Sequence, residues 1–230
     1  MWLSRALLNK KVIIQNLGLQ PYSAVMATMK TVVEAKMPGK DKQPPEIVDD
    51  YLFLCQHHPV YTVGIRTKEY MDTDVINRLK ELDADYQYTD RGGLITFHGP
   101  GQLVCYPVLN LKNYGLTLRC YIHKLEQVVM ETCKQFGVET HRTNDVGIWI
   151  GNDKIAAIGV HCQRHVTSHG LALNCNTDLS WFGHIVPCGL HGKSVTSLSR
   201  QLDENVTIEH VTPHLLDRFQ GVFGCEFLEK

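Results

Sequence analysis

The chain has 230 residues, enough for one large domain or two small ones, and its 43% hydrophobic and 20% charged residues are typical of a soluble globular protein. The net charge of −1 excludes the broad basic field with which many proteins bind nucleic acid, although a local basic patch stays open. No apolar run approaches the roughly 20 residues that a membrane-spanning helix needs.

The N-terminal segment leaves two interpretations open. The first 33 residues contain Arg5, Lys10, Lys11 and Lys30 but no acidic residue, which is the bias of a mitochondrial presequence. The same segment could be a short strand without any targeting role. It lacks the apolar core and cleavage site of a secretory signal, so we expect the eight cysteines to be reduced thiols. No CxxC pair occurs, and a structural zinc site is therefore not favoured.

The first half of the chain mixes strands and helices. Residues 11–18 are typical of a strand that Gly18 closes, and Pro21 then opens an amphipathic helix that includes Val25 and Met29. The other elements expected here are a polar, proline-rich loop at 37–46, two strands within 51–64 around a turn at His58-Pro59, and a short helix at 73–82.

In the second half the clearest element is a hairpin over 146–160, where two apolar runs flank a Gly-Asn-Asp turn. Before it, Thr117 is expected to cap a helix that ends at Gly137 and presents one apolar face, made of Leu118, Ile122, Leu125, Val129 and Phe136. The remaining elements are strands at 104–111 and 171–179, a loop at 181–198, and a helix at 212–224 with Pro213 in its first position. This order predicts one α/β or α+β domain, with a largely antiparallel or mixed central sheet flanked by helices.

The segment RGGLITFHGPGQLVCYP, residues 91–107, gathers glycines and prolines around His98. Glycine permits a close approach of the backbone to a ligand, and exposed N–H groups could bind an anion or a carbonyl oxygen. The run matches neither GxxxxGK[ST] nor a GxGxxG that opens a helix, so a nucleotide site is weakly supported. A glycine-rich bulge between paired strands is the structural alternative.

Cys188 and Lys154 are the candidates for covalent chemistry. Cys188 stands between Pro187 and Gly189 in a loop of small residues, unlike Cys55, Cys105 and Cys133, which we interpret as packing residues. A nucleophilic thiolate needs a nearby cation or base.

Lys154 is the leading cation, because strict alternation would put it on one face with Ala156 and Ile158. There it could stabilise a thiolate or carry a proton, although a lysine beside a turn more often reaches into water. His98 is the alternative partner of the thiol, and His161, Cys162 and His165 do not favour a metal site, because no second spaced pair accompanies them.

These segments together resemble the lipoyl(octanoyl) transferase family. The resemblance rests on RGGLITFHGPGQLVCYP together with NLGLQPY, QHHPVYTVG, DKIAAIGV, HGLALNCNTDL and PCGLHGKSVTSL, which follow one another in the family's order over roughly residues 11–200. It implies the fold of the biotin and lipoate ligases. It also implies transfer of an octanoyl group from octanoyl-acyl carrier protein to a lysine of a lipoyl domain, without a cofactor or metal.

The resemblance also assigns roles to individual residues. Cys188 matches the nucleophile that carries the acyl thioester, and Lys154 matches the lysine paired with it. The walls of the acyl pocket would be formed by Arg91, Gly92, Gly93, Leu94, Ile95, Thr96, Phe97, His98, Ala157, Ile158, Gly159, Gly170, Leu171 and Ala172. Lys193 departs from the family's pattern and leaves the contacts of its loop open.

The resemblance further favours a mitochondrial protein, with residues 1–10 as a short leader and 11–230 as the catalytic domain; a bacterial-style chain would instead be cytoplasmic. The implied acceptors are the lipoyl domains of 2-oxoacid dehydrogenase E2 subunits and the glycine cleavage H protein. We expect a monomer that binds neither nucleic acid nor membrane. The rival interpretations are an ATP-dependent lipoate or biotin ligase and a non-enzymatic module that binds acyl carrier protein. The role of His98 stays open.

Overall fold

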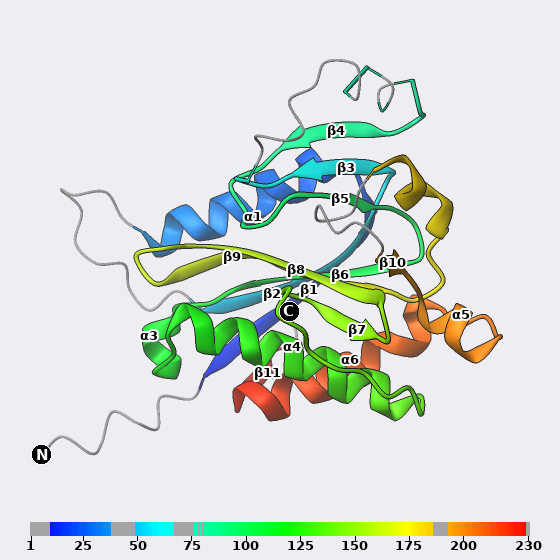
Figure 1. The fold of residues 1–230 in the computed structure, drawn as a ribbon. Helices are drawn as coiled ribbons and strands as arrows, with labels where there is room; N and C mark the ends of the chain where they lie inside the picture. Colours follow the sequence, from blue (N-terminus) through cyan, green and yellow to red (C-terminus); the bar gives the residue numbers. More distant parts are fainter. Residues whose placement is uncertain are drawn as a thin grey trace, which may run out of the picture.

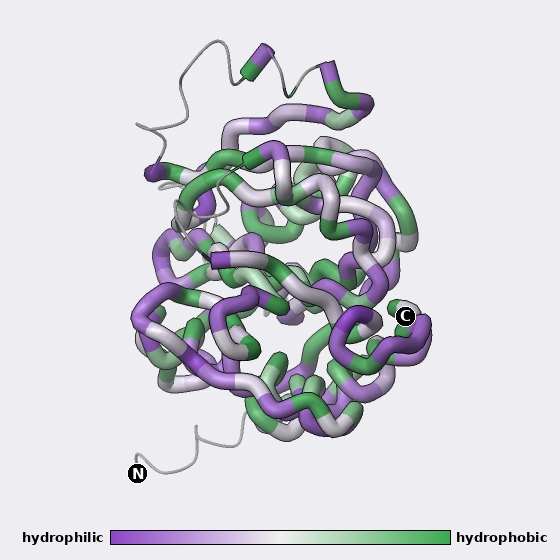
Figure 2. Tube along the Cα trace, turned by 45° about the vertical axis from the view of Figure 1, so that its right-hand side comes forward, coloured by the Kyte–Doolittle hydropathy of each residue, from purple (hydrophilic) through white to green (hydrophobic). Residues whose placement is uncertain are grey.

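The computed structural model describes residues 10–37, 49–66, 76, 77, 79, 81–185 and 193–228. Within these residues it contains a large mixed sheet and a smaller three-stranded sheet (Figure 1). The predicted α/β class with a mixed central sheet and flanking helices is confirmed. Many of the outermost turns are hydrophilic in Figure 2.

The large sheet has eight strands among the described residues, in the order β10-β8-β9-β6-β2-β1-β11, with β7 paired to β8 off this path. Its strands are β1 (Lys11–Gln20), β2 (Asp50–His57), β6 (Gln102–Val108), β7 (Ile148–Ile150), β8 (Asp153–Gln163), β9 (Val166–Asn174), β10 (Ser194–Val195) and β11 (Glu226–Leu228). The central pairs β2–β6, β6–β9 and β8–β9 are antiparallel, whereas β1 runs parallel to β2 and β11. Every residue of β6 and β9 is buried, which is expected of strands covered on both faces.

Helices cover one face of this sheet, and a helix and the small sheet lie on the other (Figure 1). The first face packs against α4 (Leu118–Gln135) and α6 (Ile208–Phe223) through the largest hydrophobic cluster. The other face packs against α1 (Tyr22–Lys36), and on the same side lies the small sheet of β4 (Asp85–Tyr88), β3 (Val60–Val63) and β5 (Ile95–His98). The remaining elements are α3 (Leu111–Tyr114), η1 (Leu179–His184) and α5 (Leu198–Leu202).

Several predicted elements are confirmed. The strand predicted at 11–18 runs to Gln20, and the helix after Pro21 buries Val25 and Met29. The side chain of Thr117 accepts a hydrogen bond from the backbone N–H of Cys120, which caps α4, and Gly137 just beyond that helix has a φ of +72°. The hairpin predicted at 146–160 forms between β7 and β8.

Other predictions need correction. Pro213 lies inside α6, not at its first position, because the helix begins at Ile208 after Thr207. The missing N–H of proline removes only one hydrogen bond near the start of this helix, which packing of its apolar face outweighs. The strand predicted at 171–179 starts earlier, at Val166, and ends at Asn174. The predicted loop at 181–198 includes the end of η1 and all of β10.

The predicted apolar face of α4 is wrong at its start. Leu118 is 40% exposed and Ile122 is half-buried, whereas Tyr121, Leu125 and Val128 form the buried stripe. Leu118 and Ile122 line a cavity instead, which the apolar pattern alone does not distinguish from core packing.

Two predictions fall wholly or partly outside the described residues. In the range of the helix predicted at 73–82, Ile76, Asn77 and Leu79 are helical, and Leu79 is fully buried. Of the proline-rich loop at 37–46, only Met37 is described. In the described part of the chain, no helix combines the length and the apolar character that crossing a membrane requires.

Candidate active site

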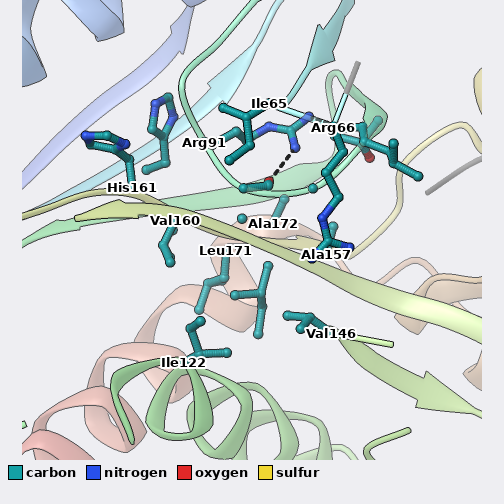
Figure 3. A pocket seen from close by; sticks show the side chains of 18 of the residues that line it. Ile65, Arg66, Arg91, Ile122, Val146, Ala157, Val160, His161, Leu171 and Ala172 are labelled. Atoms are coloured by element: carbon teal, nitrogen blue, oxygen red, sulfur yellow. Dashed lines mark hydrogen bonds between the residues drawn. The ribbon is translucent and has the colours of Figure 1, made fainter. Parts of the chain in front are cut away.

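A cavity of about 520 Å³ lies between the β8–β9 hairpin, the turn at Arg91–Leu94 and the start of α4. In Figure 3, Val160 and Leu171 point from this hairpin toward Ile122 of α4, and Arg91 and Ile65 lie on the opposite side of the strands. On the side of β8 away from β9, the described partner β7 pairs only within Asp153–Ala156, and β10 pairs with Asp153 and Lys154 on the opposite side. Beyond them β8 is an edge strand among the described residues, and the cavity continues around this edge.

Most of the predicted pocket residues lie together in this cavity. Its lining includes Arg91, Gly92, Gly93, Leu94, Thr96, His98, Ala157, Ile158, Gly159, Gly170, Leu171 and Ala172. Ile95 and Phe97 do not line it. Side chains alternate along β5, so these two pack on its other side, in a hydrophobic cluster with Tyr61 and Phe182.

Small residues on β8 and β9 give the cavity its room. In the antiparallel register Ala157 lies opposite Ala172, and Gly159 lies opposite Gly170. A Cβ atom at Gly159 would lie 3.0 Å from the carbonyl oxygen of Gly92, and one at Gly170 would lie 2.1 Å from the carbonyl oxygen of Cys105. Larger residues would therefore close the cavity at the first position and push β9 away from β6 at the second.

Arg91 fixes the turn that faces these strands. Its Nη2 donates hydrogen bonds to the carbonyl oxygens of Thr62 (2.7 Å) and Leu94 (3.0 Å), and to the hydroxyl oxygen of Thr62 (2.8 Å). The backbone N–H of Gly92 donates to the carbonyl oxygen of Val160 at 3.0 Å, which joins the turn to the edge of β8. Arg91 thus acts as a buried clamp on backbone carbonyl groups.

Lys154 is buried, with 6% of its surface exposed, and it lines the same cavity. Its Nζ donates to the carbonyl oxygen of Val146 at 3.2 Å and lies 4.7 Å from the centre of the Trp149 ring. Gly147 makes room for it, since a Cβ there would lie 3.2 Å from Cε of Lys154. The alternative of a turn lysine that reaches into water is excluded by this burial.

The predicted face of Lys154 is wrong, because β8 contains a bulge. Trp149 pairs with Lys154, but Ile148 pairs with Ala156, so Ile155 is an extra residue in the ladder. Ile155 and Ala156 both pack in the cluster beneath α4 and α6. Lys154 and Ala157 instead share a small second cavity on the other face. The bulge therefore turns the ammonium group toward the face that carries the small residues.

Sequence reasoning missed a second cation at this site. Lys193 Nζ forms an ion pair with Asp145 Oδ2 at 2.6 Å and lies 4.5 Å from the centre of the same Trp149 ring. The indole N–H of Trp149 donates to the carbonyl oxygen of Asp145 at 3.2 Å. The hairpin register could have predicted that Trp149 lies beside Lys154, but no local pattern brings Lys193 to them.

Sequence reasoning also missed an Asp–His pair at the cavity. His169 Nε2 lies 2.7 Å from Asp90 Oδ1, and the hydrogen bond from His169 lowers the pKa of Asp90. His169 is buried and has a φ of +57°, which is unusual for a residue other than glycine.

Cys188, the predicted nucleophile, lies outside the described residues, as do the other residues between Ile185 and Lys193. The interpretation of Cys55, Cys105 and Cys133 as packing residues is confirmed, since all three are buried in the hydrophobic clusters. Burial raises the pKa of the Cys133 thiol to about 12, and it raises the pKa values of Cys55 and Cys105 as well. These thiols are poor nucleophiles.

Among the described residues, no cluster of three or more His, Cys, Asp or Glu side chains is arranged to bind a metal ion.

Comparisons with known proteins agree with this geometry. A family model described as the lipoyl protein ligase A/B catalytic domain matches residues 21–220. The chain is 52% identical to the octanoyl-[acyl-carrier-protein]:protein N-octanoyltransferase LIPT2, mitochondrial, of Danio rerio, over 77% of this chain and 79% of that protein.

Two solved structures share the fold at low sequence identity. A bipartite lipoate protein ligase from Thermoplasma acidophilum is 14% identical, with a TM-score of 0.69 over 96% of this chain and 86% of that one. Biotin protein ligase from Aquifex aeolicus is 11% identical, with a TM-score of 0.54 over 94% of this chain and 71% of that one. The predicted biotin and lipoate ligase fold is thus confirmed.

Proposed function

The chain belongs to the lipoyl protein ligase A/B catalytic family, and we propose that it transfers an octanoyl group from acyl carrier protein to a lysine of a lipoyl domain through a thioester on Cys188. Octanoyl transfer is the activity that its relatives at about half identity carry in their names. The same relatives are named as mitochondrial proteins, and we extend that location to this chain.

One observation supports this chemistry above the others: the buried ammonium of Lys154 lies at a cavity whose walls are small and mainly apolar. An apolar cavity suits a fatty acyl chain, since each methylene removed from water contributes about 0.8 kcal/mol. An ammonium held at its edge can balance the charge of a thiolate that attacks the acyl carbonyl.

In the first half-reaction, the Cys188 thiolate bonds to the carbonyl carbon of the donor thioester. Backbone N–H groups of the glycine run or of the segment around Cys188 hold the oxyanion. The bond from the carbonyl carbon to the carrier sulfur then breaks, and that sulfur takes a proton from the Lys154 ammonium. One thioester replaces another of similar energy, so the exchange needs no ATP.

In the second half-reaction, the amine of the acceptor lysine bonds to the carbonyl carbon of the acyl-enzyme. The bond to Sγ of Cys188 breaks, and the thiolate is restored beside Lys154. An acceptor that arrives as an ammonium loses two protons when it becomes an amide. Lys154 takes one of them and regains its charge, and the other passes to solvent.

The acceptors in this proposal are the lipoyl domains of 2-oxoacid dehydrogenase E2 subunits and the glycine cleavage H protein, and the enzyme acts as a monomer. Residues 1–10 serve as its leader. Of the pocket residues named from the sequence, those that line the cavity contact the acyl chain, and Ile95 and Phe97 support the wall from behind.

The direct experiment is intact-mass analysis after incubation with octanoyl-acyl carrier protein, followed by peptide mapping. The wild-type chain is expected to gain one octanoyl group on Cys188, and Cys188→Ala is expected to gain none. Cys162→Ala is the matched control, because Cys162 also lines the cavity but plays no part in the mechanism. An octanoyl adduct of normal yield on Cys188→Ala would refute the proposal.

Lys154→Arg separates two roles of the lysine. Arginine keeps the positive charge but does not release a proton near neutral pH. If Lys154 carries protons, this variant loses transfer to the lipoyl domain by about 100-fold or more. Full activity would leave Lys154 only an electrostatic role.

A further inference from the structure

A chain of hydrogen bonds connects His98 at the cavity to the segment beside Lys154. Asn174 Nδ2 donates to the carbonyl oxygen of Thr196 at 2.9 Å, and Gln102 Nε2 lies 2.9 Å from Asn174 Oδ1. Gln102 Oε1 in turn lies 2.7 Å from Nδ1 of His98. All four residues are buried, so water does not compete for these groups.

The donor and the acceptor of each hydrogen bond in this series follow from the backbone carbonyl groups that it reaches. The carbonyl oxygen of Thr196 can only accept, so the amide nitrogen of Asn174 faces it and the amide oxygen of Asn174 faces Gln102. Gln102 must then present its nitrogen to Asn174. A second carbonyl gives the same answer, because Gln102 Nε2 also donates to the carbonyl oxygen of Phe97 at 3.3 Å.

The tautomer of His98 is therefore fixed. Gln102 Oε1 accepts, and the proton it receives must be on Nδ1 of His98. In the neutral ring, Nε2 then carries a lone pair. Burial lowers the pKa of His98 well below its usual value, and the neighbouring His57, Arg91 and His169 lower it further, so the ring is neutral at physiological pH.

Nε2 of His98 faces a place where a ligand can bind. His98 lines the large cavity, and no hydrogen bond from the described residues reaches this nitrogen. Nor is it among the described polar atoms that are fully enclosed without a partner. Gln102, Asn174 and Lys154 also border one small cavity, and the backbone N–H of Thr196 donates to the carbonyl oxygen of Lys154 at 3.0 Å. The acceptor nitrogen thus belongs to the same site as the catalytic lysine.

We propose that Nε2 of His98 accepts a hydrogen bond from the attacking amine of the acceptor lysine and aligns it with the acyl-enzyme. The inference rests on the proposed function, and it concerns the second half-reaction. A neutral acceptor nitrogen binds a hydrogen-bond donor, such as an N–H group. The reacting thioester carries no such donor, whereas the acceptor lysine brings two or three. The covalent changes and the two protons follow the course given above, with Lys154 as the base.

The test compares two variants that separate the function of Nδ1 of His98 from that of Nε2. His98→Asn can still donate to Gln102 but has no atom in the place of Nε2. His98→Gln can place an acceptor oxygen near that position but loses the bond to Gln102. Each variant is first acylated with octanoyl-acyl carrier protein, and transfer to a lipoyl domain is then followed in a single turnover by intact mass.

For His98→Asn, the rate constant of transfer is expected to fall about 10- to 100-fold more than that of acylation, as for loss of one hydrogen bond to a charged or reacting group. His98→Gln is expected to recover part of this loss. If the asparagine variant transfers normally, or if both steps fall equally, the proposal for His98 is wrong. A wild-type chain that is never acylated on Cys188 would instead refute the proposed function itself.

A measurement on the wild-type chain keeps the inference testable if the variants do not fold. Nitrogen-15 chemical shifts of the His98 ring report which nitrogen carries the proton. A proton on Nδ1 and none on Nε2 is expected, with a change at Nε2 when an octanoylated enzyme binds a lipoyl domain. A proton on Nε2 in the free enzyme would overturn the inference.

Discussion

The cavity combines two kinds of lining that differ in how they are built. One is the small-residue wall, made of Ala157, Gly159, Gly170 and Ala172 on the paired strands β8 and β9. The other is the polar cluster of His57, His98, Gln102, Tyr106 and Asn174, which comes from β2, β5, β6 and β9 and includes two cavity-lining residues, His98 and Tyr106. The small residues of the wall leave space for a ligand. The polar cluster presents hydrogen-bonding groups whose donor and acceptor directions are fixed.

This difference implies different responses to mutation. A side chain added at Gly159 or Gly170 would crowd backbone carbonyl oxygens, which have no rotamers to change. A change in the polar cluster alters protonation and hydrogen bonding, so its effects depend on pH and on the step of the reaction. Mutations in the wall should therefore change the stability of the fold or the preferred length of the acyl chain. Mutations in the polar cluster should change the pH dependence and the rate of transfer to the lipoyl domain.

The largest effect is expected at Gly170, where the wall meets the centre of the sheet. In Gly170→Ala the new Cβ would lie 2.1 Å from the carbonyl oxygen of Cys105 and 2.7 Å from Cδ of Pro107. Since both neighbours are held in β6, we expect a loss of about 3 kcal/mol or more in the free energy of unfolding, measured by urea denaturation. Gly183→Ala is the control, because nothing lies within 4 Å of its added Cβ. Equal stability of the two variants would contradict the close packing of β9 on β6.

The polar cluster should show itself in the pH dependence of stability. His57 is fully buried, its Nδ1 lies 3.3 Å from the carbonyl oxygen of Gln20, and its Nε2 lies 2.8 Å from the hydroxyl of Tyr106. Burial lowers its pKa to about 4. The other titratable groups around it are Tyr22, Cys55, His58, His98 and Tyr106.

The unfolded chain binds a proton at His57 near pH 6.5, and the folded chain does not. The contribution of neutral His57 to the free energy of unfolding is therefore complete above pH 6.5 and is lost as the pH falls toward 4. The drop attributable to His57 is about 3 kcal/mol, at about 1.4 kcal/mol for each pH unit. His57→Gln should reduce the slope of unfolding free energy against pH between 6.5 and 4. His98 contributes in the same direction and remains in the variant. An unchanged slope in His57→Gln would show that this histidine is not held neutral.

The two linings also differ in how far the sequence predicts them. All four residues of the wall were named in advance, but from the resemblance to the transferase family, and the pairing of β8 with β9 that brings them together was not predicted. Lys154 was also named in advance, but its face was not, because that face depends on a one-residue bulge at Ile155 that alternation does not reveal. Ile95 and Phe97 show the opposite error, since a continuous motif on a strand contributes only alternate residues to one face.

The polar cluster depends on topology instead. His98 and Gln102 lie on two successive strands, but their partners Asn174 and Thr196 come more than 70 residues later. Lys193 reaches Trp149 and Asp145 in the same way. No periodicity relates such positions, so the sequence identified His98 as a candidate without indicating which of its nitrogens faces the cavity.

The smallest effect is expected at Ala172, where the wall can set the length of the acyl chain. Ala172 lies opposite Ala157 and lines the cavity, so Ala172→Val adds two methyl groups to the space that we assign to the acyl chain. One methylene in an apolar pocket changes specificity by about 10-fold or more, equivalent to about 1.4 kcal/mol. The ratio of kcat/KM for hexanoyl over octanoyl carrier protein should therefore rise about 10-fold in this variant.

Ala172→Gly is the matched opposite, and it should shift the preference toward decanoyl carrier protein. If both variants keep the wild-type order of chain lengths while octanoyl still reaches Cys188, the acyl chain does not run along this wall, and the cavity around the edge of β8 near Ile122 and Leu171 becomes its path.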